Sequence, residues 1–366
     1  MVGLVVLLVA TSIVGALRTH GNQDFKAKWA DWLRSHHATV LVTHLESFYY
    51  SHNAPKKGGQ PNALNPIPTD PPPAVTPTTT PKVTRLKAPE PVPLVVSPPL
   101  PNEGQWQPTG PLVKGRPGMY VAQFRADQVY TGQITSAVWI DPTVLKVSLN
   151  PGATEPGGTW SEPPNILGPA LPSAAAAFNG GFRFPDAHGG FYLDGRQAVP
   201  LRDGAASIVI YADGKVDIGT WGQEVTMTPS VAAVLQNLVP IVDKGQTAPE
   251  ATYGDTRIWG ATLGASTVVA RSGIGVTADG ALLYVAGPAL TAKSLAESLQ
   301  RAGAVRAMTL DINPEWVTFN FYQHDPSQPD MVTPSKLYPP MQRPVSRYLG
   351  PTREARDFFV VSAPAA

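Results

Sequence analysis

Short apolar runs separated by turns dominate the chain from about residue 118 onward. Runs rich in Val, Ile and aromatic residues predict β-strands at 119–124, 136–140 and 144–149. Two further pairs of runs flank the tripeptide Ala-Asp-Gly and predict β-hairpins: 207–211 with 216–218, and 274–277 with 281–285. This part of the chain is therefore expected to be rich in strands.

Two segments of the same region predict helices. One lies at about 230–239, and the other is capped by Thr291 and ends at Gly303. The apolar run 304–310 follows, so the order strand, helix, strand indicates a crossover unit. Asp311 then lies just beyond the carboxyl end of a strand, where open sheets tend to bind ligands. We predict an α+β fold with strand-rich mixed sheets and a few helices.

The first 53 residues have a different pattern. Residues 1–17 are apolar apart from Thr11 and Ser12, and their length is at the lower limit for a membrane-spanning helix. The small residues at 14–16 also fit a signal-peptide cleavage site. We favour an uncleaved membrane anchor with the rest of the chain extracytoplasmic, in the cell envelope. Residues 24–50 show helical spacing, which suits helices at the membrane interface or a small helical hairpin.

Proline marks the segment that follows. Residues 54–117 hold 18 of the 40 prolines, and such a stretch is typical of a disordered, extended spacer that neither pairs its backbone nor packs a core. The run 92–100 is apolar enough for its end to pack on a domain. We therefore divide the chain into a membrane anchor with juxtamembrane helices (1–53), a Pro-rich linker (54–117) and a globular domain (118–366).

Composition excludes several classes of function. Charged residues are 15% of the chain and the formal net charge is +1, so no basic field favours nucleic acid. The absence of Cys excludes a thiolate nucleophile, a thiolate metal site and a disulfide. His188 and His324 are the only imidazoles after residue 53, which argues against a His-built zinc site. The sequence leaves the cofactor and any other metal requirement open.

The segment 174–182, Ala-Ala-Ala-Ala-Phe-Asn-Gly-Gly-Phe, is the most informative motif. Asn and Gly tolerate positive φ, so Asn179, Gly180 and Gly181 predict a sharp bend. Consecutive N–H groups in such a bend can face one concavity and bind an anion or a polyhydroxylated ligand. A hairpin turn without a ligand is the alternative.

Further candidate residues follow along the chain. Arg271 is suited to grip a phosphate, or to pair with Asp203 or Asp311. Asp311 suits general acid–base chemistry or a metal. The other candidates each have a plain structural alternative as a loop, turn or helix-start residue: His188, Asp203 and Glu315.

Five pieces of the chain, in their order along the sequence, resemble the phosphodiester glycosidase domain found in the mannose-6-phosphate uncovering enzyme and in many bacterial proteins. They lie at 178–182 (Phe-Asn-Gly-Gly-Phe), 207–219, 271–280 (beginning Arg-Ser-Gly-Ile-Gly-Val), 295–305 and 310–311 (Leu-Asp). The resemblance covers about residues 118–360. The whole chain also looks like a group of actinobacterial membrane-anchored proteins.

The resemblance implies removal of a sugar from a sugar-1-phosphodiester. It implies that Asn179 and Gly180 bind substrate, Arg271 holds the phosphodiester and Asp311 is an active-site carboxylate. The family usually continues from this Asp into a Gly-rich, Ser-containing turn, whereas residues 312–316 here are Ile-Asn-Pro-Glu-Trp. Pro removes a backbone donor and stiffens the loop.

Three functions stay open from the sequence. The leading one is an extracytoplasmic hydrolase that cleaves a glycosyl phosphodiester in a cell-envelope polymer, with Asp311 and Glu315 as the acid–base residues. The second is a non-catalytic module that binds a glycan or phosphate polymer, in which Trp316 stacks on a sugar. The third is a structural partner in an envelope assembly.

Overall fold

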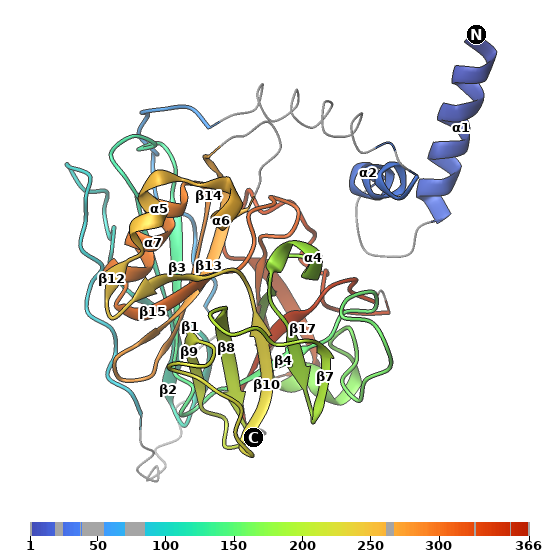
Figure 1. Ribbon diagram of the computed structural model, residues 1–366. Helices are drawn as coiled ribbons and strands as arrows, with labels where there is room; N and C mark the ends of the chain where they lie inside the picture. Colours follow the sequence, from blue (N-terminus) through green and yellow to red (C-terminus); the bar gives the residue numbers. More distant parts are fainter. Residues whose placement is uncertain are drawn as a thin grey trace.

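The structure, a computed structural model, describes residues 2–18, 25–36, 38, 55–69, 85–260, 267–325, 327–351 and 353–364. Its strands form three sheets, and short helices lie between and over them (Figure 1). Every pair of adjacent strands for which a register is defined runs antiparallel. The strand-rich α+β prediction is confirmed, but the expectation of mixed sheets is wrong, because hairpins join many of the neighbouring strands.

The largest sheet has eight strands. Their order is β1 (Gln107–Val113), β2 (Arg116–Phe124), β3 (Thr135–Ile140), β14 (Leu282–Leu290), β13 (Val269–Thr277), β15 (Ala304–Thr309), β11 (Pro240–Asp243) and β12 (Gln246–Thr247). Two five-stranded sheets complete the domain. One has the order β7 (Arg196–Val199), β6 (Phe191–Leu193), β10 (Val231–Gln236), β8 (Ala206–Tyr211) and β9 (Val216–Thr220). The other has the order β17 (Gln328–Lys336), β16 (Phe319–Asp325), β5 (Ala174–Asn179), β18 (Phe358–Ser362) and β4 (Lys146–Asn150).

The predicted hairpins and the crossover unit are present. β8 pairs with β9 and β13 pairs with β14 around the two Ala-Asp-Gly turns. β14 and β15 both run antiparallel to β13, so they are parallel to each other, and helix α7 (Ala292–Arg301) connects them. Thr291 caps α7 by accepting a hydrogen bond from the N–H of Ser294, as the sequence predicts.

Shorter helical segments connect the strands. They are η1 (Gly168–Ser173), α4 (Phe184–Ala187), α5 (Pro249–Tyr253) and α6 (Thr256–Trp259). α7 packs on β13, β14 and β15, and α5 packs on α7 (Figure 1). One face of the large sheet is thus covered by helices, which leaves the other face for the two smaller sheets.

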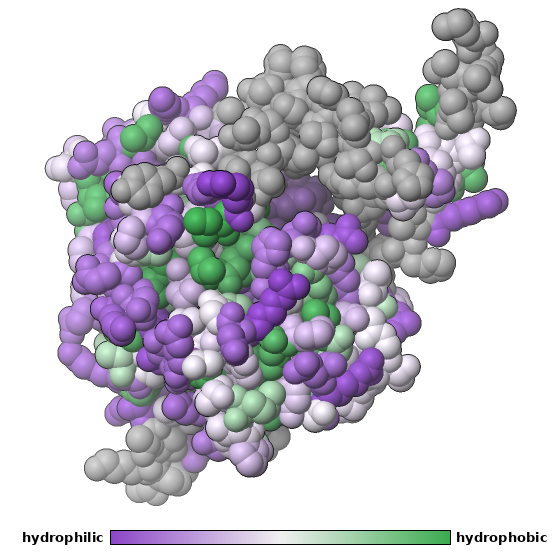
Figure 2. All heavy atoms as spheres, in the orientation of Figure 1, coloured by the Kyte–Doolittle hydropathy of each residue, from purple (hydrophilic) through white to green (hydrophobic). Residues whose placement is uncertain are grey.

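The main core lies where the three sheets meet. It combines Tyr284 of the large sheet with Phe191 and Ile208 of one small sheet and Phe178 and Phe319 of the other. The rings of Phe178 and Phe319 are stacked with centroids 5.5 Å apart. Residues 174–177 of β5 are fully buried alanines, so their small side chains allow both flanking strands and the neighbouring sheet to approach. On the face shown in Figure 2, hydrophobic residues form only scattered patches among hydrophilic ones.

The helix that we predicted at 230–239 is absent, since residues 231–236 form strand β10. β10 is the central strand of its sheet and pairs with both β6 and β8. The run Val-Ala-Ala-Val-Leu is buried on both faces, and a short apolar run of this kind does not distinguish a helix from a strand by its periodicity. Tertiary pairing decided the outcome.

The N-terminal segment forms helix α1 (Val2–Arg18) and helix α2 (Phe25–Ser35). The two pack together, and the indole N–H of Trp29 donates to the hydroxyl of Ser12 at 2.9 Å. In the described part of the chain, no helix combines the length and the hydropathy required to cross a membrane, and α1 has 17 residues. The second apolar cluster, at 40–49, lies outside the described residues.

Part of the Pro-rich segment belongs to the folded domain. β1 falls within it and pairs with β2, so the expectation that this stretch cannot pair its backbone is wrong at 107–113. Val92 and Leu100 are buried, and Asn65 exchanges two hydrogen bonds with the side chain of Gln123. Extended, proline-containing chain can therefore lie along the edge of a sheet, with only some of its backbone paired. Residues 70–84 lie outside the described part.

Candidate functional site

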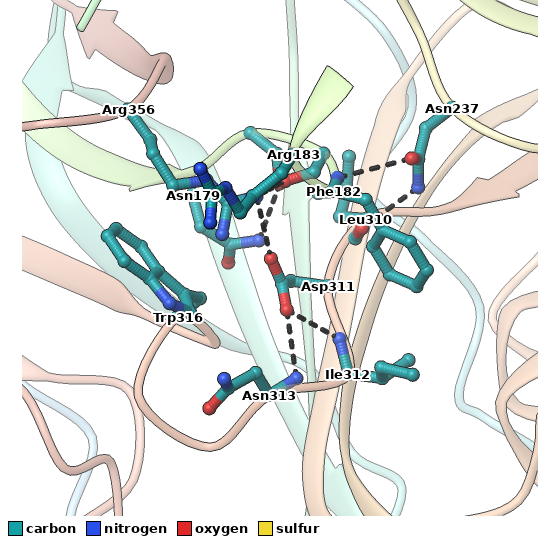
Figure 3. A network of polar contacts seen from close by, with 12 residues as sticks. Asn179, Phe182, Arg183, Asn237, Leu310, Asp311, Ile312, Asn313, Trp316 and Arg356 are labelled. Atoms are coloured by element: carbon teal, nitrogen blue, oxygen red, sulfur yellow. Dashed lines mark hydrogen bonds and ion pairs between the residues drawn. The ribbon is translucent and has the colours of Figure 1, made fainter. Parts of the chain in front are cut away.

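The ends of strands from all three sheets meet at one buried polar cluster (Figure 3). Asn179 ends β5, Asn237 follows β10, and Asp311 follows β15. Arg356 and Asp357 precede β18. Charged and amide side chains at these positions are almost fully shielded from solvent. Of our candidates, Asn179 and Asp311 are therefore brought together, linked through Ser272.

Asn179 organises this meeting point. Its Oδ1 accepts hydrogen bonds from the Tyr284 hydroxyl at 3.0 Å and from the N–H of Thr318 at 3.1 Å. Its Nδ2 donates to the carbonyl of Gly180 at 2.8 Å and to Oγ of Ser272 at 3.1 Å. The same Oγ accepts from the N–H of Asp311 at 3.1 Å. Because its amide is fully engaged, Asn179 holds the strand ends together.

The Gly180–Gly181 bend is built differently from our expectation. Neither glycine has a positive φ. A Cβ on Gly180 would instead overlap the carboxylate of Asp357, and one on Gly181 would lie 3.1 Å from Cγ of Asn237. The N–H of Gly180 donates to the carbonyl of Asp357 at 3.2 Å, and that of Phe182 donates to Oδ1 of Asn237 at 3.1 Å. Glycine is needed for close approach, and protein groups use two of the N–H groups that we expected to bind an anion.

Asp311 is 3% exposed and is held from two sides (Figure 3). Its Oδ1 accepts hydrogen bonds from the N–H groups of Ile312 and Asn313, each at 2.8 Å. Its Oδ2 forms an ion pair with Nη2 of Arg356 at 3.1 Å. Burial raises the pKa of Asp311, while Arg356 and the two N–H groups oppose the rise. The result is an oriented carboxylate that is shielded from solvent.

Arg356 connects Asp311 to the glycine bend and to Trp316. Its guanidinium also donates to the carbonyl of Gly181. It lies 4.4 Å from the centre of the Trp316 ring, and Arg343 and Arg347 lie at 4.9 and 4.8 Å. Guanidinium groups thus surround the ring that we expected to stack on a sugar, so a sugar would have to displace one of them.

Each of the two other arginines has a carboxylate partner. Nε of Arg343 lies 3.2 Å from Oε2 of Glu315, and Nε of Arg347 lies 2.8 Å from Oε2 of Glu354. Burial alone would raise the pKa of Glu354, but Arg347 and Arg343 hold it below its usual value. Glu315, our second catalytic candidate, is therefore an ion-pair partner next to the Asp311 loop.

Asp357 is a second buried carboxyl group that the sequence did not reveal. It is 3% exposed, and within the described part of the chain neither of its carboxylate oxygens makes a well-formed hydrogen bond. Burial raises its pKa to about 7, with Glu155 adding to the rise, while Arg356 and nearby backbone N–H groups oppose it. Glu155 in turn accepts a hydrogen bond from Arg183, at 3.0 Å.

Arg271 has surroundings unlike those that we expected. Its guanidinium donates to the carbonyls of Leu290, Thr267 and Trp259, at 2.9, 3.3 and 3.5 Å. Within the described ranges it pairs with neither Asp203 nor Asp311 and with no other carboxylate. Burial lowers its pKa to about 10. Alternation along β13 places its side chain on the opposite face from that of Ser272, which contacts Asn179.

The two remaining candidates lie at the surface. His188 is exposed and ends α4 with a φ of 49°, a left-handed conformation. Asp203 is exposed in the turn before β8. No hydrogen bond or ion pair in the described part of the chain joins either residue to Asp311. Among the described residues, no group of three or more His, Asp or Glu side chains lies close enough to hold a metal ion.

Sequence reasoning missed several members of the cluster. Asn237 bridges two sheets, because its Nδ2 donates to the carbonyls of Thr309 and Leu310, both at 2.9 Å. Arg356 and Asp357 belong to the run Arg-Glu-Ala-Arg-Asp at 353–357, directly before an apolar strand. Such a dense group of charges beside a buried strand was the available signal. For Asn237 the sequence offered none.

Comparison with known proteins identifies a family for part of the chain. Residues 172–311 match the model of the phosphodiester glycosidase family. The matched segment is less than half of the chain and includes Asn179, Ser272 and Asp311. It ends before Arg356 and Asp357. No curated protein matches the sequence significantly.

Two solved structures show a loose likeness. One is the catalytic domain of zebrafish N-acetylglucosamine-1-phosphodiester alpha-N-acetylglucosaminidase, auto-inhibited by its pro-peptide. It is 16% identical, with a TM-score of 0.42, over 71% of this chain and 88% of that chain. The other is a protein from Synechocystis, 13% identical with a TM-score of 0.36, over 67% of this chain and 62% of that chain. Scores below 0.5 do not establish a shared fold.

Proposed function

We propose that this protein is a hydrolase that cleaves a glycosyl phosphodiester. The observation that carries the proposal is the Asp311–Arg356 ion pair at the end of a segment matched by the phosphodiester glycosidase family. A carboxylate and a guanidinium side by side suit a substrate with one sugar and one phosphate group. The substrate class comes from the family and its assignment to this chain is part of the proposal.

The residues take distinct roles in this reaction. The bond between C1 of the sugar and the phosphate oxygen breaks, the phosphate monoester leaves, and water supplies the hydroxyl group to C1. Asp311 accepts the proton of the attacking water, because its raised pKa suits a base. Arg356, with Arg183 nearer the surface, binds the phosphate oxygens. Arg271, our earlier choice for this contact, already donates to three carbonyls.

The test is sugar release by the purified full chain from a UDP-sugar and from a simpler sugar-1-phosphodiester. Asp311→Asn should lower kcat about 10²–10⁴-fold, the range typical of a lost acid–base group, with an unchanged folded state. Asp213→Asn, in the exposed turn after β8, is the matched control and should keep full activity. Binding of these compounds by the wild-type chain without turnover would contradict the hydrolase proposal.

A binding module for glycans or phosphate polymers is the second candidate. It is favoured by the guanidinium groups around Trp316, since arginine and an aromatic ring together suit a phosphorylated sugar. This candidate predicts ligand binding that survives Asp311→Asn and is lost in Trp316→Ala. Retained binding together with absent turnover would favour it over the hydrolase.

We also propose that the protein acts outside the cytoplasm, anchored through residues 1–17 and acting on an envelope polymer. The support is the apolar sequence of α1 and the exposure of Val14 and Leu17 along it. A reporter enzyme fused after residue 18 should be found active outside the cytoplasm. Activity confined to the cytoplasm would contradict this location.

A further inference from the structure

We propose that Asp357 donates the proton to the departing phosphate group, so the site binds a phosphodiester only while this carboxyl is protonated. The inference rests on the proposed function and adds a second carboxyl with a role opposite to that of Asp311. Asp357 also lies outside the segment that matches the family model.

The position of Asp357 supports this role. It directly follows Arg356, whose guanidinium pairs with Asp311 and acts electrostatically on Asp357. Its carboxylate lies against Gly180, where a Cβ would overlap it. The glycine bend and Asp357 are thus in direct contact at the site, and a larger residue at 180 would displace the carboxyl group.

The hydrogen bonding of the two carboxyl groups differs. Asp311 accepts two N–H groups and pairs with Arg356, which suits a negative charge. Neither oxygen of Asp357, nor Oε2 of the nearby Glu155, has a well-formed hydrogen bond in the described part of the chain. A buried carboxylate without a well-formed hydrogen bond is costly, whereas a protonated carboxyl has a hydrogen to donate and carries no charge.

The charged groups around Asp357 fix the pH range of this behaviour. Arg356 lowers its pKa, Glu155 raises it, and burial is the largest contribution, which together place the pKa at about 7. Arg183, just before α4, pairs with Glu155 at 3.0 Å. Asp311 pairs with the guanidinium of Arg356 at 3.1 Å. Asp357 therefore changes charge near neutral pH.

The proposed step balances protons. Asp357 gives its proton to an oxygen of the phosphate as the C1–O bond breaks, and the monoester leaves as a monoanion. Water adds hydroxyl to C1 and its other proton passes to Asp311, after which solvent restores the starting protonation of both groups. The second pKa of a phosphate monoester is about 6, so proton transfer from Asp357 is nearly balanced in energy. Two carboxyl groups in unlike surroundings thus take the acid and the base role.

The experiment measures binding of diethyl phosphate, which keeps one negative charge across the range, to the full chain between pH 5.5 and 8.5. Wild type should lose about tenfold in affinity for each pH unit above about 7. Asp357→Asn, which keeps the shape and a hydrogen-bond donor, should bind without this pH dependence. Glu155→Gln should move the loss of affinity to lower pH, because it removes a neighbouring negative charge. Asp213→Asn should behave as wild type.

The outcomes separate this inference from the proposed function. Affinity that is constant with pH in wild type, or a pH dependence that persists in Asp357→Asn, overturns the role of Asp357 even if sugar release is found. The inference is supported if binding depends on pH in wild type but not in Asp357→Asn. If turnover is absent in that case, only the proposal that the protein is a hydrolase is overturned. If Asp357→Asn does not fold, the Glu155→Gln variant decides. A loss of affinity at the same pH as in wild type would then overturn the inference.

Discussion

Among the buried arginine–carboxylate pairs of the described residues, Arg125–Glu103 and Arg356–Asp311 differ in whether the carboxyl groups in and beside the pair are all hydrogen-bonded. Glu103 accepts four hydrogen bonds: Oε1 from N and Nε of Arg125, at 2.8 and 3.0 Å, and Oε2 from N of Leu100 and Nη2 of Arg125, at 2.8 and 2.7 Å. Arg125 also donates to the carbonyl of Pro98 at 2.6 Å. This pair ties the segment before β1 to the end of β2.

The pair of Arg356 with Asp311 has a different neighbour. Asp357, next in the chain, keeps two buried oxygens without a well-formed hydrogen bond in the described structure. Buried polar groups in proteins are usually satisfied, and exceptions call for an explanation. The comparison teaches that a complete network holds chain segments together, and the incomplete one is where we propose proton transfer and binding.

The largest expected effect concerns pH and Asp357. Its pKa is raised from 3.8 to about 7 in the folded protein, so between these values the folded state binds more protons than the unfolded state. The free energy of unfolding therefore falls as pH rises from about 4 to about 7. Asp357→Asn lacks this loss and should exceed wild type by up to about 4 kcal/mol at pH 8.

Urea unfolding of both proteins at pH 4 and pH 8 measures this difference. At pH 4 the carboxyl is largely protonated in the folded state, so the two proteins should be close in stability. An equal difference at the two pH values would show that the charge of Asp357 does not matter.

The second effect concerns the pair of Glu103 with Arg125. Glu103→Gln should lower the free energy of unfolding by about 3 kcal/mol, because it leaves the buried Arg125 without its counter-charge. The pKa of Glu103 is lowered by Arg125 and the N–H of Leu100 against the effect of burial, so its contribution is present above the ordinary pKa and lost in acid. Denaturant unfolding at pH 7 is the measurement.

Sugar release per folded molecule should not change in Glu103→Gln. Glu90→Gln, which removes an exposed pair with Lys87, is the matched control and should leave stability unchanged. A fall in kcat in Glu103→Gln without a fall in stability would contradict the separation of the two pairs.

Gly180→Ala should cost about 2 kcal/mol of stability, since the added methyl group overlaps the Asp357 carboxylate and the chain has to shift. The cost should fall by at least about 1 kcal/mol when Asp357→Ala is present, a coupling that a double-mutant cycle measures. Additive effects would mean that the glycine is required for another reason.

The smallest effect concerns Trp316. Trp316→Leu should lose about 1 kcal/mol, because it removes the contacts of three guanidinium groups with the ring. Trp160, which has one guanidinium at 4.2 Å, is the control, and Trp160→Leu should lose less. Thermal unfolding of both variants measures the difference, and an equal or larger loss at Trp160 would contradict the account.

Local patterns predicted much of the fold. The Asp-Gly hairpins, the cap at Thr291, the crossover through α7 and the place of Asp311 after β15 were all read correctly, because turn chemistry and capping act over a few neighbouring residues. The run at 231–236 was misread as a helix, since its identity as a strand depends on two partners distant in the sequence.

The sequence by itself singled out Asn179, the two glycines and Asp311 as candidates, and it determined that no Cys is present and that the formal net charge is +1. Only the tertiary structure decided the reasons. It gave Gly180 its role through contact with Asp357, directed Arg271 to carbonyls, and brought Arg356 to Asp311 across separate sheets. Contacts and burial of this kind arise when distant strand ends converge, and it is burial, not residue type, that raises the pKa of Asp357.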